Sequence, residues 1–337
     1  MPKGEYLQYG GQAIVEGVMM RSPRFFSVAC RAPDGQIILR TEEIEKTWIG
    51  RQKWLKAPFL RGSLALLDSM ALGTRAMRFS SAIQLGGNPH APEAKEAENE
   101  APSGKVQDMA VGVSLIVGIT LGLLLFIYVP NWIAETAHNH FHTKDMRLTN
   151  FFAELTKAIF FFTYLWLIGQ LPDIKEVFKY HGAEHKAINT LEADQPLEMD
   201  FCMRQTRLHP RCGTSFAIIV LLLGFVVFTF VPRYPFGQHR FALIDVSARF
   251  FVELLILPFI AGVAYELLRL AGRFRNTTLV SILFALGLAS QYLTTREPEE
   301  KHVEVALAAL RACLAAEAGE RIPEPDPVVA SFESTPV

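Results

Sequence analysis

The chain has 337 residues, of which 50% are hydrophobic, and its formal net charge is −1. A charge so close to zero gives no electrostatic reason to expect a nucleic-acid partner, and we expect none. The four cysteines are widely scattered and show no disulfide-type spacing: Cys30, Cys202, Cys212 and Cys313. This usage favours a reducing compartment with free thiols. The first residues are polar, and we expect no cleavable signal peptide.

Residues 1–85 predict a small α+β module, a hairpin followed by a helix. The segment 25–44 is rich in β-formers and contains Pro33-Asp34-Gly35, which predicts a β-hairpin that turns there. From 58 to 83 the apolar residues recur at helical spacing, so this helix is expected to pack on the hairpin or lie along a membrane surface. Glu16 stands inside an apolar stretch and has two interpretations: the solvent face of a strand, or a carboxylate directed at a site.

Two segments are predicted to be disordered because they are poor in apolar residues. They are a linker at 86–108, rich in Pro, Ala and Glu, and a tail at 319–337, rich in Pro and acidic residues. A cytoplasmic helix is predicted for 294–318, with Thr294 or Thr295 as its cap and Pro298 in its first turn.

Residues 109–293 predict a membrane module. Four apolar segments are long enough, or nearly so, to cross a bilayer: 109–129, 151–171, 215–231 and 250–270. A further run at 278–293 is too short to be counted as a span and is interpreted as an interfacial or re-entrant helix. The fold class is therefore an α-helical integral membrane protein with about four transmembrane helices and a small α+β amino-terminal module.

The distribution of Lys and Arg predicts the orientation. The loop at 172–214 is rich in them, with Lys175, Lys179, Lys186, Arg204, Arg207 and Arg211, and the opposite loops are sparser. The positive-inside rule places this loop and both termini in the cytoplasm. The ionisable residues of the predicted spans lie near their ends, which makes transport the least favoured function. The histidines of HNHFHT, from His138, are expected to lie in a polar external loop.

The stretch from Lys179 to Ser215 carries the candidate chemistry. On a helix, His181 and His185 lie one turn apart on one face, with Glu184 within about 100° of both. Two imidazoles at this spacing can chelate a divalent cation, and His209 and Cys212 can complete its sphere. HGAEH also fits H-x-x-E-H, in which the glutamate is the base beside the metal. Five-residue patterns also arise by chance, and a cysteine before a glycine can simply pack.

Several motifs together resemble one family. They are GGQAIVEGVMMRSP, FLRGSLALLDSMALGTRAMRFSS, KYHGAEHKAINTLE, RLHPRCGTSF, LPFIAGVAYELLRLAG and YLTTREPEEKHVEVALAAL. They are similar to the YqhQ-like family of bacterial membrane proteins, which is described as predicted metal-dependent enzymes. The resemblance implies a multi-pass protein of the bacterial inner membrane and supports a divalent metal, with zinc as the first choice. It implies no substrate.

Two functions remain open at this stage. The first is a metal-dependent hydrolase at the cytoplasmic face, with His181 and His185 as ligands, His209 or Cys212 as the third, and Glu184 as general base. The second is a non-enzymatic scaffold in which all four side chains hold a structural metal. A cysteine hydrolase using Cys212 with His209 is a further alternative. The expected partners are the lipid bilayer and an unidentified substrate or protein on the cytoplasmic side.

Overall fold

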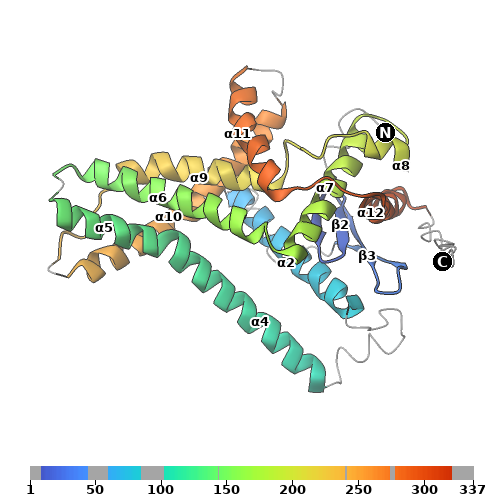
Figure 1. The fold of residues 1–337 in the computed structure, drawn as a ribbon, viewed down its shortest axis with the longest axis horizontal. Helices are drawn as coiled ribbons and strands as arrows, with labels where there is room; N and C mark the ends of the chain where they lie inside the picture. Colours follow the sequence, from blue (N-terminus) through green and yellow to red (C-terminus); the bar gives the residue numbers. More distant parts are fainter. Residues whose placement is uncertain are drawn as a thin grey trace, which may run out of the picture.

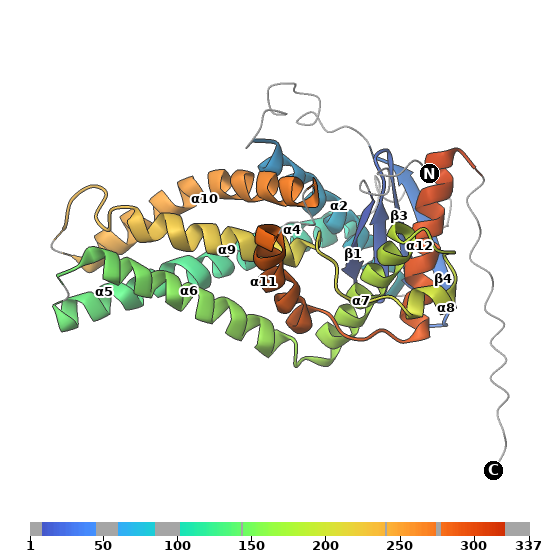
Figure 2. The same ribbon diagram turned by 90° about the horizontal axis from the view of Figure 1, so that it is seen from above.

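The computed structural model describes residues 9–44, 60–84, 102–142, 144–239, 241–273 and 278–320. Helices α5 (Val129–Phe141), α6 (Met146–Ile168), α9 (Gly213–Phe230) and α10 (Ala242–Arg273) run lengthwise beside one another (Figure 1). A small sheet and its covering helices stand at one end of this bundle (Figure 2). The predicted combination of a helical bundle and a small α+β module is therefore present.

Within the part of the chain that the structure describes, four helical stretches are long and apolar enough to cross a membrane: Gly112–Phe141, Met146–Ile168, Gly213–Phe230 and Ala242–Leu268. Their outward surface is apolar as well, since Leu255 is 79% exposed and Ile116 is 66% exposed. In a water-soluble bundle these faces would be polar, so this surface suits lipid.

Two predicted boundaries are wrong at the first of these stretches. Helix α4 begins at Pro102 (Pro102–Leu123), so 102–108 is helical and not part of a disordered linker. The chain then continues through a π-helical turn, η3 (Leu124–Tyr128), into α5, so His138 and His140 lie in the last turn of a helix and not in a loop. The π turn carries the helix past Pro130, whose ring would otherwise clash with the preceding turn. Residues 86–101 and 321–337 lie outside the described residues.

The sheet is an antiparallel meander in the order β1-β2-β3-β4 (Gly10–Ile14, Gly17–Arg21, Phe25–Arg31, Ile37–Glu43). The predicted hairpin around Pro33-Asp34-Gly35 is confirmed as β3–β4. A second hairpin was not predicted: Ile14 pairs with Gly17, so Val15 and Glu16 form its turn, and Glu16 has a φ of 49°. Glu16 therefore lies on a turn and not on a strand, and its carboxylate accepts a hydrogen bond from Tyr180.

The sheet buries both faces because its apolar side chains alternate along each strand. On β2, Val18 and Met20 face α7 (Pro172–Glu192) and α12 (Glu300–Ala318), whereas Met19 faces α2 (Leu60–Gln84). Figure 2 shows α2 between the sheet and α10. Of the two alternatives for this amino-terminal helix, packing on the hairpin is the one that the structure shows.

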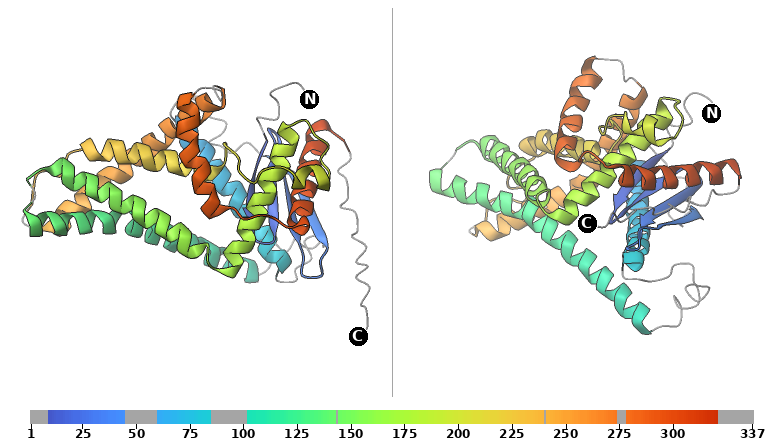
Figure 3. Two further views of the ribbon diagram at one scale, coloured as in Figure 1. Left: turned by 45° about the horizontal axis from the view of Figure 1, so that its top comes forward. Right: turned by 45° about the vertical axis from the view of Figure 1, so that its right-hand side comes forward.

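Two shorter elements complete the described part. Helix α8 (Met199–Met203) follows α7, and α11 (Thr278–Thr294) projects across the direction of the bundle (Figure 3). The predicted cap of the carboxy-terminal helix is wrong, since Glu299 is the N-cap of α12 and Thr294 ends α11. The carboxylate of Glu299 suits this position because the N-terminal amides of a helix carry partial positive charge.

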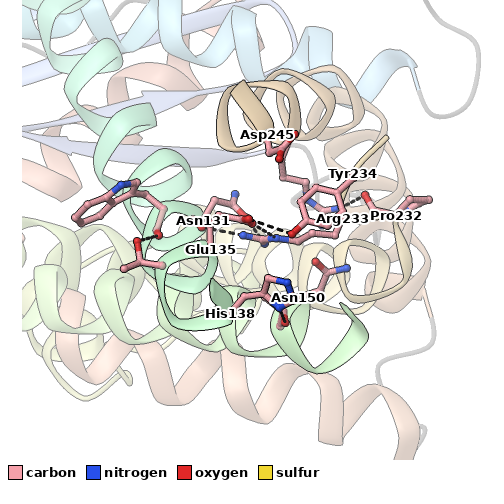
Figure 4. Close-up of polar contacts among 12 residues, drawn as sticks. Asn131, Glu135, His138, Asn150, Pro232, Arg233, Tyr234 and Asp245 are labelled. Carbon is pink, nitrogen blue, oxygen red and sulfur yellow. Dashed lines mark hydrogen bonds and ion pairs between the residues drawn. The ribbon is translucent and has the colours of Figure 1, made fainter. Parts of the chain in front are cut away.

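A network of charged and polar side chains lies inside the bundle. Its members are at most 7% exposed: Asn131, Glu135, Glu154, Lys157, Arg233, Arg249 and Glu253. The Nζ of Lys157 lies 2.6 Å from Glu154 and 2.7 Å from Glu253, and Arg249 donates to Glu253 at 2.8 Å. Figure 4 shows Arg233 and Tyr234 directed at Glu135, with Asn131 beside them. Three carboxylates thus face three cations.

This network corrects the expectation that the ionisable residues lie only near span ends. Lys157 is midway along Met146–Ile168, and Glu253 is near the middle of Ala242–Leu268. Arg249 also donates to the carbonyls of Phe228, Val231 and Pro232, so it caps the end of α9. The charges serve to join α5, α6, α9 and α10.

The contact between α7 and α12 is expected to make the free energy of unfolding depend on pH in the acidic range. Partial burial acts to raise the pKa of Glu176, but hydrogen bonds from Lys301, His302 and Lys179 outweigh it and lower the pKa to about 2. A carboxylate with a folded pKa below its unfolded value stabilises the protein above the unfolded pKa, and this stability is lost as the pH falls toward the folded pKa.

We therefore expect Glu176→Gln to lower the free energy of unfolding by about 1–3 kcal/mol at neutral pH, allowing for screening of a partly exposed group. The difference from wild type should shrink as the pH falls from about 5 toward 2. Chemical unfolding of detergent-solubilised protein across this range measures it, with Glu320→Gln as the exposed control. A difference that is constant with pH would contradict the assignment.

Candidate metal centre

Close packing on two sides fixes helix α7, which carries three of the five predicted site residues. A Cβ at Gly11 on β1 would lie 2.7 Å from Cγ of Glu184, and a Cβ at Gly182 would overlap the carbonyl oxygen of Arg296. Only glycine permits these approaches. The helix is therefore held between the sheet and the segment that follows α11, and its side chains have little freedom to move.

The structure brings His181, His185 and Cys212 together. One nitrogen of each imidazole and the Sγ of Cys212 lie within 4.8 Å of one another. The Nε2 of His181 is 3.1 Å from Sγ, and the two imidazole centroids are 4.4 Å apart. His185 is 1% exposed and Cys212 is 8% exposed, so these two ligand candidates are shielded from bulk water, whereas His181 is half-buried.

Backbone carbonyls orient both imidazoles. The Nδ1 of His181 lies 2.9 Å from the carbonyl oxygen of Thr294, and the Nδ1 of His185 lies 2.6 Å from that of Arg207. A carbonyl oxygen only accepts, so each Nδ1 carries the hydrogen, and in a neutral imidazole the Nε2 then bears the lone pair. A metal-ligating histidine is held in this way by its other ring nitrogen.

The Nε2 of His185 is a buried polar atom with no hydrogen-bond partner among the described residues. Leaving a buried acceptor unpaired costs about 1–3 kcal/mol. Burial also lowers the pKa of His185, which favours the neutral imidazole that binds metal. An unpaired lone pair beside a thiol is the arrangement expected of a ligand.

Cys212 occupies the N-cap of α9. Its Sγ accepts the amide N–H of Thr214 at 3.5 Å, at the positive end of the helix dipole. The preceding turn is closed by a bond from the Cys212 amide to the carbonyl of His209. The sulfur is thus positioned by the start of an apolar helix, one turn of chain away from His209.

His209 stands beside the group and not in it. Its ring centroid is 5.7 Å from that of His185, but its Nε2 lies 3.3 Å from a carboxylate oxygen of Glu192. Gln291 holds its backbone by bonding both the amide and the carbonyl. The structure therefore does not present His209 as a ligand alongside the other three. The contact that the structure gives Cys212 is with His181, whose Nε2 lies 3.1 Å from its Sγ.

Glu184 packs against Gly11 of the sheet, and its carboxylate is not one of the three groups that converge. Burial raises the pKa of Glu184, against the opposing effects of His181, His209 and the Gly11 amide, whose N–H its carboxylate accepts. One carboxylate oxygen can accept the Gly11 N–H while the second stays available to accept a proton. The side chain is 6% exposed, so any proton that it takes up is shielded from solvent.

The three side chains suit a tetrahedral zinc ion. Bonds of about 2.0–2.1 Å to nitrogen and 2.3 Å to sulfur place ligand atoms about 3.5 Å apart. The 3.1 Å between Nε2 of His181 and Sγ is close to this distance. No two of the three ligand atoms are more than 4.8 Å apart, so zinc binding would bring them closer together by about 1 Å at most. Two neutral imidazoles and one thiol are also ligand types that zinc prefers.

A model of the family described as "Protein of unknown function (DUF1385)" matches residues 57–316, which include all five predicted site residues. The chain belongs to this family. It is also 33% identical over 311 residues to the uncharacterized protein YqhQ of Bacillus subtilis (strain 168), covering 92% of this chain and 93% of the relative. No solved structure matches. The resemblance based on the sequence motifs is therefore confirmed.

Sequence reasoning missed most of the groups that position this site. They are the carbonyls of Thr294 and Arg207, the side-chain amide of Gln291, and Gly182. Backbone carbonyls leave no residue signature, so the first two could not have been found. Gly11 lies in the quoted motif GGQAIVEG, and a glycine inside a strand pattern is a signal of close backbone approach.

Proposed function

We propose that this chain is a metal-dependent hydrolase of the bacterial inner membrane, in which His181, His185 and Cys212 hold a divalent metal, with zinc as the first choice. One observation carries the proposal: both imidazoles have Nδ1 bonded to a backbone carbonyl, and one ring nitrogen of each lies within 4.8 Å of the same sulfur. Chance packing of two histidines and a cysteine would not fix both tautomers in the ligating form.

The number of ligands supports catalysis. A structural zinc is enclosed by four side chains, whereas a catalytic zinc has three and keeps one position for water. With His209 directed at Glu192, three side chains converge among the described residues. A zinc bound here would lower the pKa of a bound water and polarise the bond to be cleaved.

Glu184 is the residue assigned to proton transfer. It accepts the proton of the attacking water as the water oxygen bonds to the electrophilic atom of the substrate, and it then delivers that proton to the leaving group. Glu184 is thus returned to its ionised form, and one water molecule has been added across the cleaved bond. Its burial between α7 and β1 keeps this proton from exchanging with solvent.

The location forms part of the proposal. The four apolar helices support a multi-pass protein whose principal surroundings are the lipid bilayer. The excess of Lys and Arg in 172–214 supports a cytoplasmic site and cytoplasmic termini. The substrate, or a protein partner, would then come from the cytoplasmic side. The near-zero net charge gives no electrostatic reason to expect a nucleic-acid partner.

The second candidate is a scaffold with a structural metal. It is favoured by the fact that the site joins α7, the turn before α9 and the end of α11, which are far apart in sequence. A metal would fasten these segments together. Glu184 would then serve only to receive the Gly11 amide and pack against β1.

Glu184→Gln separates the two candidates. The amide has nearly the same shape and can still accept the Gly11 N–H, but it cannot take a proton. For a hydrolase we expect normal protein level and metal content with loss of function, since general-base catalysis contributes about 10²–10⁴-fold. Complementation of a phenotype of the deletion strain is the readout, with the exposed Glu198→Gln as control. Full rescue by Glu184→Gln, with metal retained, would exclude the hydrolase.

A further inference from the structure

The described side chains of helix α11, from Ala285 to Thr294, have their polar and apolar faces reversed relative to a water-soluble helix. Ser290, Gln291 and Thr294, at helical spacing, are at most 4% exposed. Leu286, by contrast, is 45% exposed and Tyr292 is 57% exposed, and α11 contains no charged residue. A helix in water turns its apolar side inward. A helix that turns polar groups inward and apolar groups outward is suited to lipid on its outer side.

The buried polar face of α11 supports the candidate metal centre directly. The carbonyl of Thr294 accepts Nδ1–H of His181, and Gln291 bonds the backbone of His209 and the hydroxyl of Ser215. A Cβ at Gly287 would lie 2.9 Å from Oγ of Ser215, so α11 packs tightly on the start of α9. The site and the apolar outer face of α11 are thus two sides of one helix.

A basic side chain lies between the site and this apolar face. The backbone carbonyl of Arg207 accepts a hydrogen bond from Nδ1 of His185. The guanidinium of the same arginine lies 5.4 Å from the centre of the Tyr292 ring. Glu297 is 4.0 Å from this guanidinium but is closer to Lys186, at 2.7 Å. The Nε of Arg296 is buried with no hydrogen-bond partner among the described residues. Aromatic and basic residues in this arrangement are typical of the region where lipid head groups lie.

We infer that the site takes its substrate from the lipid layer: an amphiphile with an anionic head group, such as a phospholipid, and not a water-soluble molecule. Its chains lie along the face that carries Leu286 and Tyr292. Its head group lies beside Arg207 and reaches the pair His181 and Cys212. This inference rests on the proposed function for the chemistry, but the route of access is tested separately.

Cys212 serves as the reporter. Full-length protein is placed in phosphatidylglycerol nanodiscs that contain phosphatidylethanolamine with a maleimide on its amine, which keeps the negative phosphate. Peptide mass spectrometry then measures labelling of Cys212, in parallel with a water-soluble maleimide. Tyr292→Cys reports on the outer face of α11. Gln36→Cys, on the exposed turn between β3 and β4, is the control for a site away from lipid.

We expect the lipid-borne maleimide to label Cys212 and Tyr292→Cys but not Gln36→Cys, which only the soluble reagent should label. Arg207→Gln should slow the lipid-borne reaction at Cys212 and leave the soluble one unchanged. Labelling of Cys212 by the soluble reagent alone would overturn the lipid route. If neither reagent labels Cys212, the outer face of α11 decides. Labelling of Tyr292→Cys by the water-soluble reagent alone would then overturn the lipid route as well.

Added zinc separates this inference from the proposed function. Zinc should protect Cys212 from both reagents and leave Tyr292→Cys reactive. Lipid-borne labelling that zinc does not prevent would leave the lipid route standing and remove the metal centre. Zinc protection together with soluble labelling alone would keep the metal centre and remove the lipid route.

Discussion

Lys157→Met is expected to cost about 3–5 kcal/mol of stability, because it leaves the buried carboxylate of Glu154 without its counter-ion. The Nζ of Lys157 bonds Glu154 and Glu253, and all three side chains are at most 7% exposed. Glu253 keeps Arg249 and Asn131, but Lys157 supplies the ion pair of Glu154. An isolated charge between apolar helices has no water to compensate it.

The double variant Lys157→Met with Glu154→Gln should recover most of this loss, since it restores the balance of charge while removing the same lysine. Unfolding of the purified protein in detergent, followed by circular dichroism, measures the three proteins. Lys144→Met, at an exposed position between α5 and α6, is the matched control and should be silent. A double variant no more stable than Lys157→Met would show that packing, and not charge balance, sets the cost.

This network was not predicted because a hydropathy pattern shows only where a charged residue lies along an apolar segment. It does not show which charged residues of other segments lie beside it. Glu154 and Lys157 stand near one end of the apolar run 151–171, but α6 begins at Met146, which moves them toward the middle of the helix. Glu135 was assigned outside the first span, since the window ended before Pro130. The π turn that continues the helix has no sequence signal of its own.

The regular elements were predictable where a local pattern decides them. Apolar runs gave the four long helices, helical periodicity gave α2, and Pro33-Asp34-Gly35 gave the β3–β4 turn. The β1–β2 turn was missed because Val15 and Glu16 are not the Asn or Gly usual at such turns. Tertiary contacts hold it instead, including the bond from Tyr180 to the carboxylate of Glu16.

The candidate site was predictable in part for the same reason. Helical spacing was enough to place His181 and His185 together, and ligand chemistry suggested Cys212. The direction of the His209 ring depends on Glu192, and its backbone is held by Gln291, a residue far away in sequence. No local pattern contains that information, so His209 was grouped with the ligands.

His185→Ala and His181→Ala are each expected to abolish metal binding, because a site with two remaining ligands loses most of its affinity. Cys212→Ser should weaken it strongly, since a hydroxyl is a poor ligand for zinc. Glu184→Gln and His209→Ala should retain the metal, because neither removes an atom of the converging group. The last variant tests the structure directly, since the sequence alone predicted His209 to be a ligand.

Metal content per chain is the most direct test. Full-length protein and its variants are purified in detergent without chelators and analysed for zinc and other divalent metals by mass spectrometry. The control is His140→Ala, an exposed histidine near the end of α5. We predict roughly one metal ion per chain in wild type, His140→Ala and His209→Ala, and almost none in His185→Ala. Wild-type protein that binds no metal, even after incubation with zinc, would contradict the account and leave the pair of Cys212 and His181 as the chemistry to explain.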